Sequence, residues 1–442
     1  MESQLYFYCL SGPDKGKRVV LTKDAPIAIG KNINANILSD DPFVTDEYVG
    51  LTLLDSEQVA FNCSHGYNIF VDGASHQSCQ IIPGNQQIRI GSSIWKFISP
   101  DPVTQKSAQA ANKFGSYFQE KITNVTGVSR LEGFKLGHIF SSVFKKRSDE
   151  EIEKEFIVGT SETTPSITNI DTNWAKPWVF FRLLILSIGV FLLFYYAFVR
   201  FNNQLLVPGL IFVGTFAIPF SCLIFFIEMH APRNISLYQV IKLMFIGGII
   251  SLIISLLLFD LTKLSNWLSA SAAGIVEEAG KLITVVLLMA NKKRYPWIFN
   301  GLLLGASVGT GFAIFESAGY AFLYGLNTLD NLTSIIIARG VFSPFAHIIW
   351  TAAAAGAFWK VKGSGNFKWE IFSSSKFLKV LAAVMILHML WNAPFGIPLF
   401  NYPLSYYLKY LLLGIIGWII VLGLMQDGLK QLNQAREDSK LE

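Results

Sequence analysis

Residues 265–290 read SNWLSASAAGIVEEAGKLITVVLLMA, an apolar stretch that contains Glu277, Glu278 and Lys281. On insertion scales, a charge at the centre of a membrane helix costs about 2.5–3.5 kcal/mol, whereas each Leu or Ile returns only about 0.3–0.6 kcal/mol. Three charges therefore cost roughly 9 kcal/mol, which the apolar residues of the segment barely offset. The stretch predicts a membrane helix whose charged side chains find partners on neighbouring helices.

The composition of the whole chain is that of a membrane protein. Of its 442 residues, 52% are hydrophobic and only 15% are charged, and the mean hydropathy is +0.42. From Trp174 onward, eight apolar segments have the length of a membrane span. We expect these spans at 177–199, 205–228, 238–260, 266–290, 297–322, 333–358, 376–397 and 404–425.

Loop charges predict the orientation of these spans. The loop NKKRYP at 291–296 is basic, as are the loop at 360–379 and the tail, whereas the loops at 324–334 and 393–405 contain neither Lys nor Arg. The positive-inside rule then predicts that both termini lie in the cytosol, which fits a multi-pass protein of an inner (plasma) membrane. The start of the chain lacks the basic region and apolar core of a cleavable signal peptide.

The first 100 residues have a different character from the rest. Short β-rich runs such as RVVLT, IAIG, VAFNC and QIRIG are separated by Gly, Pro, Asn and Asp, which predicts an all-β sandwich. The four cysteines show neither metal-ligand spacing nor a disulfide pattern, which fits a reducing compartment. Residues 101–175, rich in Ser, Thr, Gln, Lys and Glu, predict a linker with an amphipathic segment. The membrane domain then covers 176–428 and a cytosolic tail covers 429–442.

Most of residues 5–98 resembles the forkhead-associated (FHA) domain, which binds phosphothreonine peptides. The resemblance lies in IAIGK, NINANILSDDPFVT, GYNIFVDG and PGNQQIRIGSSIWKF. The family's Ser-Arg-x-His stretch reads Thr45-Asp46-Glu47-Tyr48 here, and two acids would repel a phosphate dianion. Lys31 and Thr45 are the remaining candidate phosphopeptide-binding residues. A phosphothreonine reader and a degenerate protein-interaction sandwich are both open interpretations.

Polar groups recur in four consecutive expected spans, the fourth to the seventh. They are Glu277, Glu278 and Lys281, then Glu316, then His347, and finally His388 with Asn392. Gly301, Gly305 and Gly309 form a stripe of small residues that lets helices approach closely. Glu316 shares the face of that stripe, so we expect the charges to converge inside a helix bundle. A purely structural role for so many intramembrane ionisable groups is the weaker interpretation.

The same residues carry a second resemblance. EEAGK (277–281), FAIFE (312–316), the lone His347 after SPFA, and HMLWN (388–392) are similar to the four motifs of the PrsW family of intramembrane proteases, in order and spacing over 265–395. This family is grouped with the CAAX-processing endopeptidases, which usually have His in the second motif. The resemblance implies cleavage of a membrane-anchored regulatory protein, as in site-1 regulated proteolysis. Asn392 stands where some relatives have Asp.

Peptide hydrolysis needs an activated water, a stabilised oxyanion and a proton donor. We expect Glu277 or Glu278 to act as general base beside Lys281, with His347 orienting the water. His388 and Asn392 would polarise the scissile carbonyl, and Glu316 would be a ligand or a proton shuttle. A zinc ion on His347, His388 and either Glu278 or Glu316 is the alternative. Without an HExxH motif, the sequence slightly favours a metal-free or loosely metal-dependent enzyme.

Other classes of protein remain open. A CAAX-type prenyl-protein endopeptidase is the nearest enzymatic alternative, and a non-catalytic membrane scaffold is the nearest alternative without chemistry. A proton-coupled transporter would also place Glu and His in membrane helices, but the two halves of the chain show no internal symmetry. The expected partners are a membrane-anchored protein substrate and a phosphoprotein or other cytosolic protein at residues 1–100. No nucleic-acid partner is expected.

Overall fold

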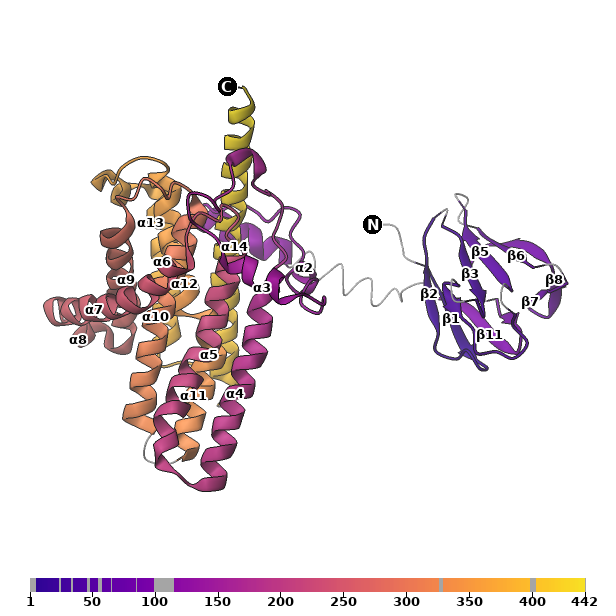
Figure 1. Ribbon diagram of the computed structural model, residues 1–442, viewed down its shortest axis with the longest axis horizontal. Coiled ribbons are helices and arrows are strands. Elements are labelled where there is room, and N and C mark those ends of the chain that lie inside the picture. The colour runs from indigo at the N-terminus through magenta and orange to yellow at the C-terminus, as the bar shows by residue number, and fades with distance from the viewer. Residues whose placement is uncertain are drawn as a thin grey trace. The chain divides into compact units, whose positions relative to one another are not determined.

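The computed structural model (Figure 1) describes residues 5–23, 25–32, 35–45, 48–54, 58–64, 66–84, 86–98, 115–325, 329–397 and 403–441. The chain forms two compact units, Met1–Ser116 and Tyr117–Glu442. Each unit has its own hydrophobic core. The first unit is built of strands and the second of helices.

The first unit is a sandwich of two sheets, as the sequence predicts. One sheet has six strands in the order β2-β1-β11-β10-β7-β8, and the other has five in the order β4-β3-β5-β6-β9. The strands are β1 (Leu5–Ser11), β2 (Arg18–Leu21), β3 (Ile27–Gly30), β4 (Ile37–Leu38), β5 (Val49–Leu53), β6 (Val59–Cys63), β7 (Ile69–Val71), β8 (Ala74–His76), β9 (Ser78–Ile81), β10 (Ile88–Ile90) and β11 (Ser93–Ile98). The inward faces meet in an aromatic core, where Phe7 stacks on Trp95 with 5.1 Å between ring centroids.

The second unit contains seven helices that are long and apolar enough to cross a membrane, counted over the residues that the structure describes. This confirms a multi-pass helical domain, close to the eight spans expected. Counted segment by segment, including short helices and spans that consist of two successive segments, the helices of this unit are α2 (Leu136–Phe140), α3 (Asp149–Phe156), α4 (Val179–Phe201), α5 (Val207–Glu228), α6 (Leu237–Lys242), α7 (Gly248–Thr262), α8 (Ser265–Leu268), α9 (Ala273–Met289), α10 (Ile298–Gly325), α11 (Leu329–Phe342), α12 (His347–Lys362), α13 (Ser375–Asn392) and α14 (Leu404–Leu441).

Two of the expected spans are broken. The segment expected at 266–290 is divided by a 3₁₀ turn over Ser269–Ala272, and Ser269 has a positive φ of 50°. The continuous helix that follows, α9, has 17 residues. At 1.5 Å per residue it is about 25 Å long, shorter than a bilayer core of about 30 Å. The segment expected at 333–358 is divided between α11 and α12 by a 3₁₀ turn over Ser343–Phe345.

Two segments that the sequence analysis places outside the membrane domain pack onto the long helices. Much of the expected linker 101–175 is folded against the long helices, because Val128 and Ile170 are buried in their core and the backbone N–H of Glu132 donates to Oε1 of Gln426 in α14. The expected tail 429–442 continues helix α14 to Leu441, and its Leu432 is fully buried. Apolar residues scattered through polar sequence produce both differences.

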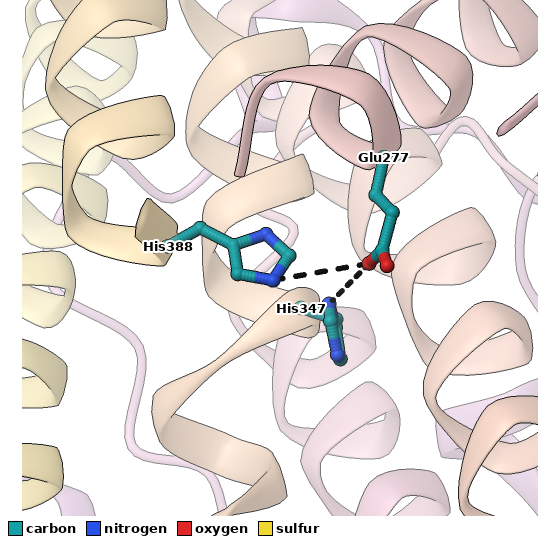
Figure 2. A group of neighbouring side chains, drawn as sticks. All are labelled: Glu277, His347 and His388. Carbon is teal, nitrogen blue, oxygen red and sulfur yellow. Dashed lines mark ion pairs between the residues drawn. The ribbon is translucent and has the colours of Figure 1, made fainter. Parts of the chain in front are cut away.

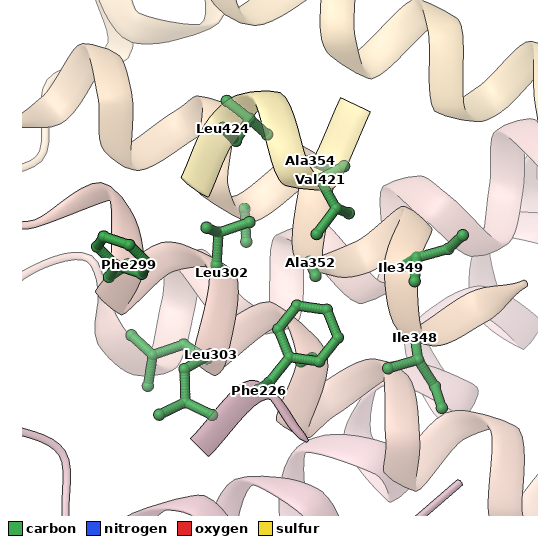
Figure 3. Packing of buried hydrophobic residues seen from close by; sticks show 14 of the residues in the cluster. Phe226, Phe299, Leu302, Leu303, Ile348, Ile349, Ala352, Ala354, Val421 and Leu424 are labelled. Atoms are coloured by element: carbon green, nitrogen blue, oxygen red, sulfur yellow. The ribbon is translucent and has the colours of Figure 1, made fainter. Parts of the chain in front are cut away.

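Helices α10 and α12 form the centre of the bundle. A Cβ atom on Gly305 would lie 2.4 Å from the carbonyl oxygen of Thr351, and one on Gly301 would lie 2.5 Å from that of Ala355. The glycine stripe therefore brings the two helix backbones into contact, as the sequence predicts. Figure 3 shows the apolar layer that surrounds this contact, in which Leu302 of α10 lies near Phe226 of α5 and Val421 of α14.

Replacing Gly305 with Ala should destabilise the bundle. The new methyl group would overlap the α12 backbone, and overpacking of this kind typically costs about 1–3 kcal/mol. Thermal unfolding of the purified protein in detergent should show a lower Tm. Gly189→Ala in α4 is the matched control, since nothing lies within 4 Å of a Cβ atom there. An equal Tm for both variants would contradict the close contact of α10 and α12.

Candidate active site

The ends of three helices border one cavity in the second unit. Helix α9 begins at Ala273, α12 begins at His347, and α13 ends at Asn392, just before Pro394. These ends line a cavity of about 670 Å³, together with side chains from α7, α10, α11 and α14. The breaks described above therefore open a space within a domain of long helices. Such irregular backbone at membrane depth is tolerated only where it is enclosed by protein or lines a wet cavity.

Glu277, His347 and His388 converge on the wall of this cavity (Figure 2). Oε2 of Glu277 lies 3.9 Å from Nδ1 of His347 and 3.8 Å from Nε2 of His388. One donor atom from each residue lies within 4.8 Å of the other two. Oε2 of Glu277 is buried and has no hydrogen-bond partner among the residues that the structure describes. The group can therefore accept a further ligand between three donor atoms.

Each histidine is held through its other ring nitrogen by a carboxylate. Nδ1 of His388 lies 2.9 Å from Oε1 of Glu278, and Nε2 of His347 lies 3.0 Å from Oε2 of Glu316. Trp350 stacks on the His388 ring with 4.5 Å between centroids, which fixes the ring plane. Both imidazoles are thus oriented from behind, with one nitrogen turned toward Glu277.

Each of these carboxylates has a cation beside it. Nζ of Lys281 lies 2.5 Å from Oε1 of Glu278, and both side chains are completely buried. The guanidinium of Arg339 forms an ion pair with Glu316. Burial of an unpaired charge costs several kcal/mol, so the two cations explain how these carboxylates are tolerated.

The hydrogen bonds also define the histidine tautomers. Lysine can only donate, and Nζ of Lys281 lies 2.9 Å from Nδ1 of His347, so that nitrogen carries a lone pair. Nε2 of His347 then carries the proton and donates to Glu316. His388 has the opposite arrangement, because its Nδ1 donates to Glu278 and its Nε2 lone pair faces Glu277.

The structure brings together all but one of the seven predicted catalytic residues. Glu277, Glu278, Lys281, Glu316, His347 and His388 form one connected cluster. Asn392 lines the same cavity but forms no hydrogen bond with these six among the described residues. Glu277, rather than Glu278 or Glu316, is the carboxylate grouped with both histidines, because the other two bind the distal nitrogens.

The sequence analysis missed two charged residues at the site. Arg339 lines the cavity, and the carbonyls of Trp391 and Ala393 at the end of α13 accept hydrogen bonds from the buried Lys409. Both residues lie within expected membrane spans. A charge within an apolar span is the same sequence signal that identified the other charged site residues. Neither lies within a recognised motif, so neither was singled out.

The fold and site define a multi-pass membrane protein with a buried Glu/His centre. The family model described as "PrsW family intramembrane metalloprotease" matches residues 235–434, which include every member of that centre. No curated protein sequence matches the chain. The predicted relation of the membrane domain to the PrsW proteases is confirmed.

Solved structures similar to this chain match its first unit. The FHA domain of CT664 from Chlamydia trachomatis is 14% identical, with a TM-score of 0.21, and the match covers 22% of this chain and all of that one. The FHA domain of FhaA, in complex with the intracellular domain of Rv3910, is 18% identical with a TM-score of 0.19, over 21% of this chain and 99% of that one. The chain thus joins an FHA-like sandwich to a PrsW-like membrane domain, as the sequence predicts.

Glu278→Gln should destabilise the helical unit strongly. It leaves the Lys281 ammonium buried without a counter-charge, and breaking a buried pair in this way typically costs about 3–5 kcal/mol. The double variant Glu278→Gln, Lys281→Met should recover much of the loss, since it removes both charges. Unfolding in detergent measures both effects.

Glu132→Gln is the matched control for the Glu278→Gln variant. Glu132 pairs with Lys430 at a similar distance of 2.8 Å, but both side chains are about half exposed. Exposed pairs contribute about 0–1 kcal/mol. A loss in Glu278→Gln no larger than in Glu132→Gln would contradict a buried, stabilising pair.

Proposed function

We propose that this protein is an intramembrane endopeptidase that hydrolyses a peptide bond of a membrane-anchored protein. One observation carries the proposal: a buried carboxylate oxygen of Glu277 without a partner faces two imidazole nitrogens on the wall of a cavity. Among the ionisable groups of the cluster, three carboxylates meet only two cations. Its unbalanced carboxylate, Glu277, is the one open to a substrate or a ligand.

The residues divide the work of hydrolysis among them. Glu277 accepts the proton of the attacking water, since Glu278 is fully buried and bound to Lys281 and His388. His347 and His388 orient that water between them. Asn392, one turn beyond His388 on the cavity wall, donates a hydrogen bond to the scissile carbonyl. Glu278 and Glu316 keep the two imidazoles in the required tautomers.

The cluster also fits the metal that the family description names. Two histidines and one carboxylate with an open position are the donor set of hydrolytic zinc sites, and each histidine is backed by a carboxylate, as metal-bound histidines usually are. Glu277, His347 and His388 would hold the ion. When bound, zinc would polarise the water and the scissile carbonyl. It would also replace the Lys281 ammonium as partner of the His347 lone pair.

The position of the site supports cleavage in the outer part of the membrane. Helix α12 runs from His347 to Lys362, which is 16 residues or about 24 Å, and ends beside a basic loop. The positive-inside rule assigns that loop to the cytosol. The site therefore opens toward the opposite side of an inner (plasma) membrane, where a single-span regulatory protein could present an extended segment. Both chain termini would be cytosolic.

Cleavage of candidate single-span substrates from the same cell, in liposomes that contain the purified protein, tests this function. Glu277→Gln should lower the cleavage rate by about 10²–10⁴-fold, because it removes the proton acceptor of the metal-free reaction or, with zinc bound, the carboxylate ligand of the ion. A zinc chelator should abolish cleavage by the wild type, and added zinc should restore it. Glu162→Gln, at an exposed site outside the cluster, should cleave normally.

The other outcomes separate the alternatives. Cleavage by metal-free wild type would refute the zinc site and leave a glutamate protease. Cleavage of prenylated substrates alone would identify a CAAX-type enzyme. A folded wild type that binds candidate substrates without cutting them, unchanged by Glu277→Gln, would establish a scaffold.

For the sandwich we propose recognition of a cytosolic phosphoprotein. The backbone N–H of Lys31 donates to the carbonyl of Thr45 at 2.9 Å, and both residues are exposed, so the two candidate phosphate-binding residues are neighbours on the surface of the sandwich. Asp46 and Glu47 lie outside the described residues.

Lys31→Ala should weaken the binding of phosphothreonine peptides by about 10-fold, because it removes a charge-assisted contact to phosphate. Lys15→Ala, in the turn between β1 and β2, is the control. Titration with matched peptides with and without phosphate measures the effect. Equal affinities for the two peptides would instead support a sandwich that has lost phosphate recognition.

A further inference from the structure

We propose that Arg339 is a positioning residue of the active site, which fixes the His347 imidazole through Glu316. The inference rests on the proposed function, but it concerns a residue that lies outside the four motifs. Arg339 is on α11, whereas His347 is the first residue of α12, beyond the break at Ser343–Phe345. The carboxylate of Glu316 on α10 is the group that both of them contact.

One carboxylate oxygen therefore holds both sides of a broken helix. Oε2 of Glu316 accepts from the Arg339 guanidinium and from Nε2 of His347, the latter at 3.0 Å. At Ala346 the backbone has φ −127° and ψ −126°, so the helix itself does not align the two halves. The contact with Glu316 supplies the alignment that a continuous helix would otherwise give.

The guanidinium is itself fixed at three points. Besides Glu316, its Nε donates to Oγ of Ser317 at 3.0 Å, and the group lies 4.2 Å from the ring centroid of Tyr320. The three partners follow one another along α10. The planar guanidinium of arginine can make these contacts at the same time. The ammonium of lysine is a single compact charge on a flexible side chain, so it cannot. The site therefore favours arginine over any cation of equal charge.

The contacts that lead from Arg339 through Glu316 to His347 resemble those that lead from Lys281 through Glu278 to His388. Lys281 neutralises Glu278, which holds His388. Arg339 neutralises Glu316, which holds His347. Each imidazole thus has a carboxylate and a cation behind it. Loss of such outer partners typically costs about 10–100-fold in metal affinity or activity.

The test compares zinc affinity of purified full-length variants by competition with a chromophoric chelator. Arg339→Gln should bind zinc about 10–100-fold more weakly than wild type, and Arg339→Lys should lose less. Arg233→Gln is the control, since it breaks a partly exposed pair with Glu155 outside the cavity and should leave zinc affinity unchanged. Because Arg339 acts through Glu316, adding Arg339→Gln to Glu316→Gln should weaken binding no further.

A second readout needs neither zinc nor substrate. ¹⁵N NMR of labelled histidines should show His347 as a single Nε2–H tautomer in wild type and in Arg233→Gln, and as a mixture in Arg339→Gln. If wild type binds no zinc, the proposed metal centre fails, and this comparison still decides the role of Arg339. Unchanged zinc affinity together with an unchanged tautomer in Arg339→Gln would overturn the proposal, as would equal changes in Arg233→Gln.

Discussion

The membrane domain is organised by the need to pair every charge that it buries. A carboxylate within a helix bundle is tolerated only beside a cation or a ring of donors, since water is not available to solvate it. Here the two pairs, Lys281 with Glu278 and Arg339 with Glu316, are joined through the His347 imidazole, which contacts both Lys281 and Glu316. The chain of contacts crosses α9, α10, α11 and α12, so the pairing of these buried charges also fixes how those helices pack.

The packing of small residues makes this pairing possible. Gly305 and its neighbours bring the α10 backbone against α12, which places Glu316 within hydrogen-bond reach of His347. Gly274 in α9 packs equally closely against the α13 backbone near Met389, one residue beyond His388. Larger side chains at these positions would separate the carboxylates from the histidines that they orient. The glycines therefore belong to the site as much as the charged residues do.

Sequence reasoning predicted the sandwich, the polytopic helical domain and the members of the polar cluster, because each depends on a local pattern or on the cost of a charge in hydrocarbon. It could not predict which carboxylate faces both histidines. Glu277 and Glu278 are adjacent and chemically identical, and only the rotation of α9 against α13 distinguishes them. It also missed the breaks before Ala273 and His347, because polar or helix-breaking residues such as Ser269, Ser271 and Pro344 interrupt the apolar segments too briefly to end a predicted span. Hydropathy predicts which segments lie in the membrane, but it does not predict where the helix within such a segment is interrupted.

At those breaks the backbone is not helical, which a membrane normally permits only around an enclosed or wet cavity. This supports a role for the breaks in the proposed hydrolysis. A continuous helix presents only side chains to its surroundings, and it satisfies its own peptide groups. Where α9 and α12 begin and α13 ends, backbone groups and polar side chains such as Ser265, Ser269 and Asn392 border the cavity instead. An extended substrate segment has unpaired peptide groups of its own, which cost several kcal/mol each in hydrocarbon. The ends of these helices supply polar partners for such a segment at the depth where Glu277 and the two imidazoles meet.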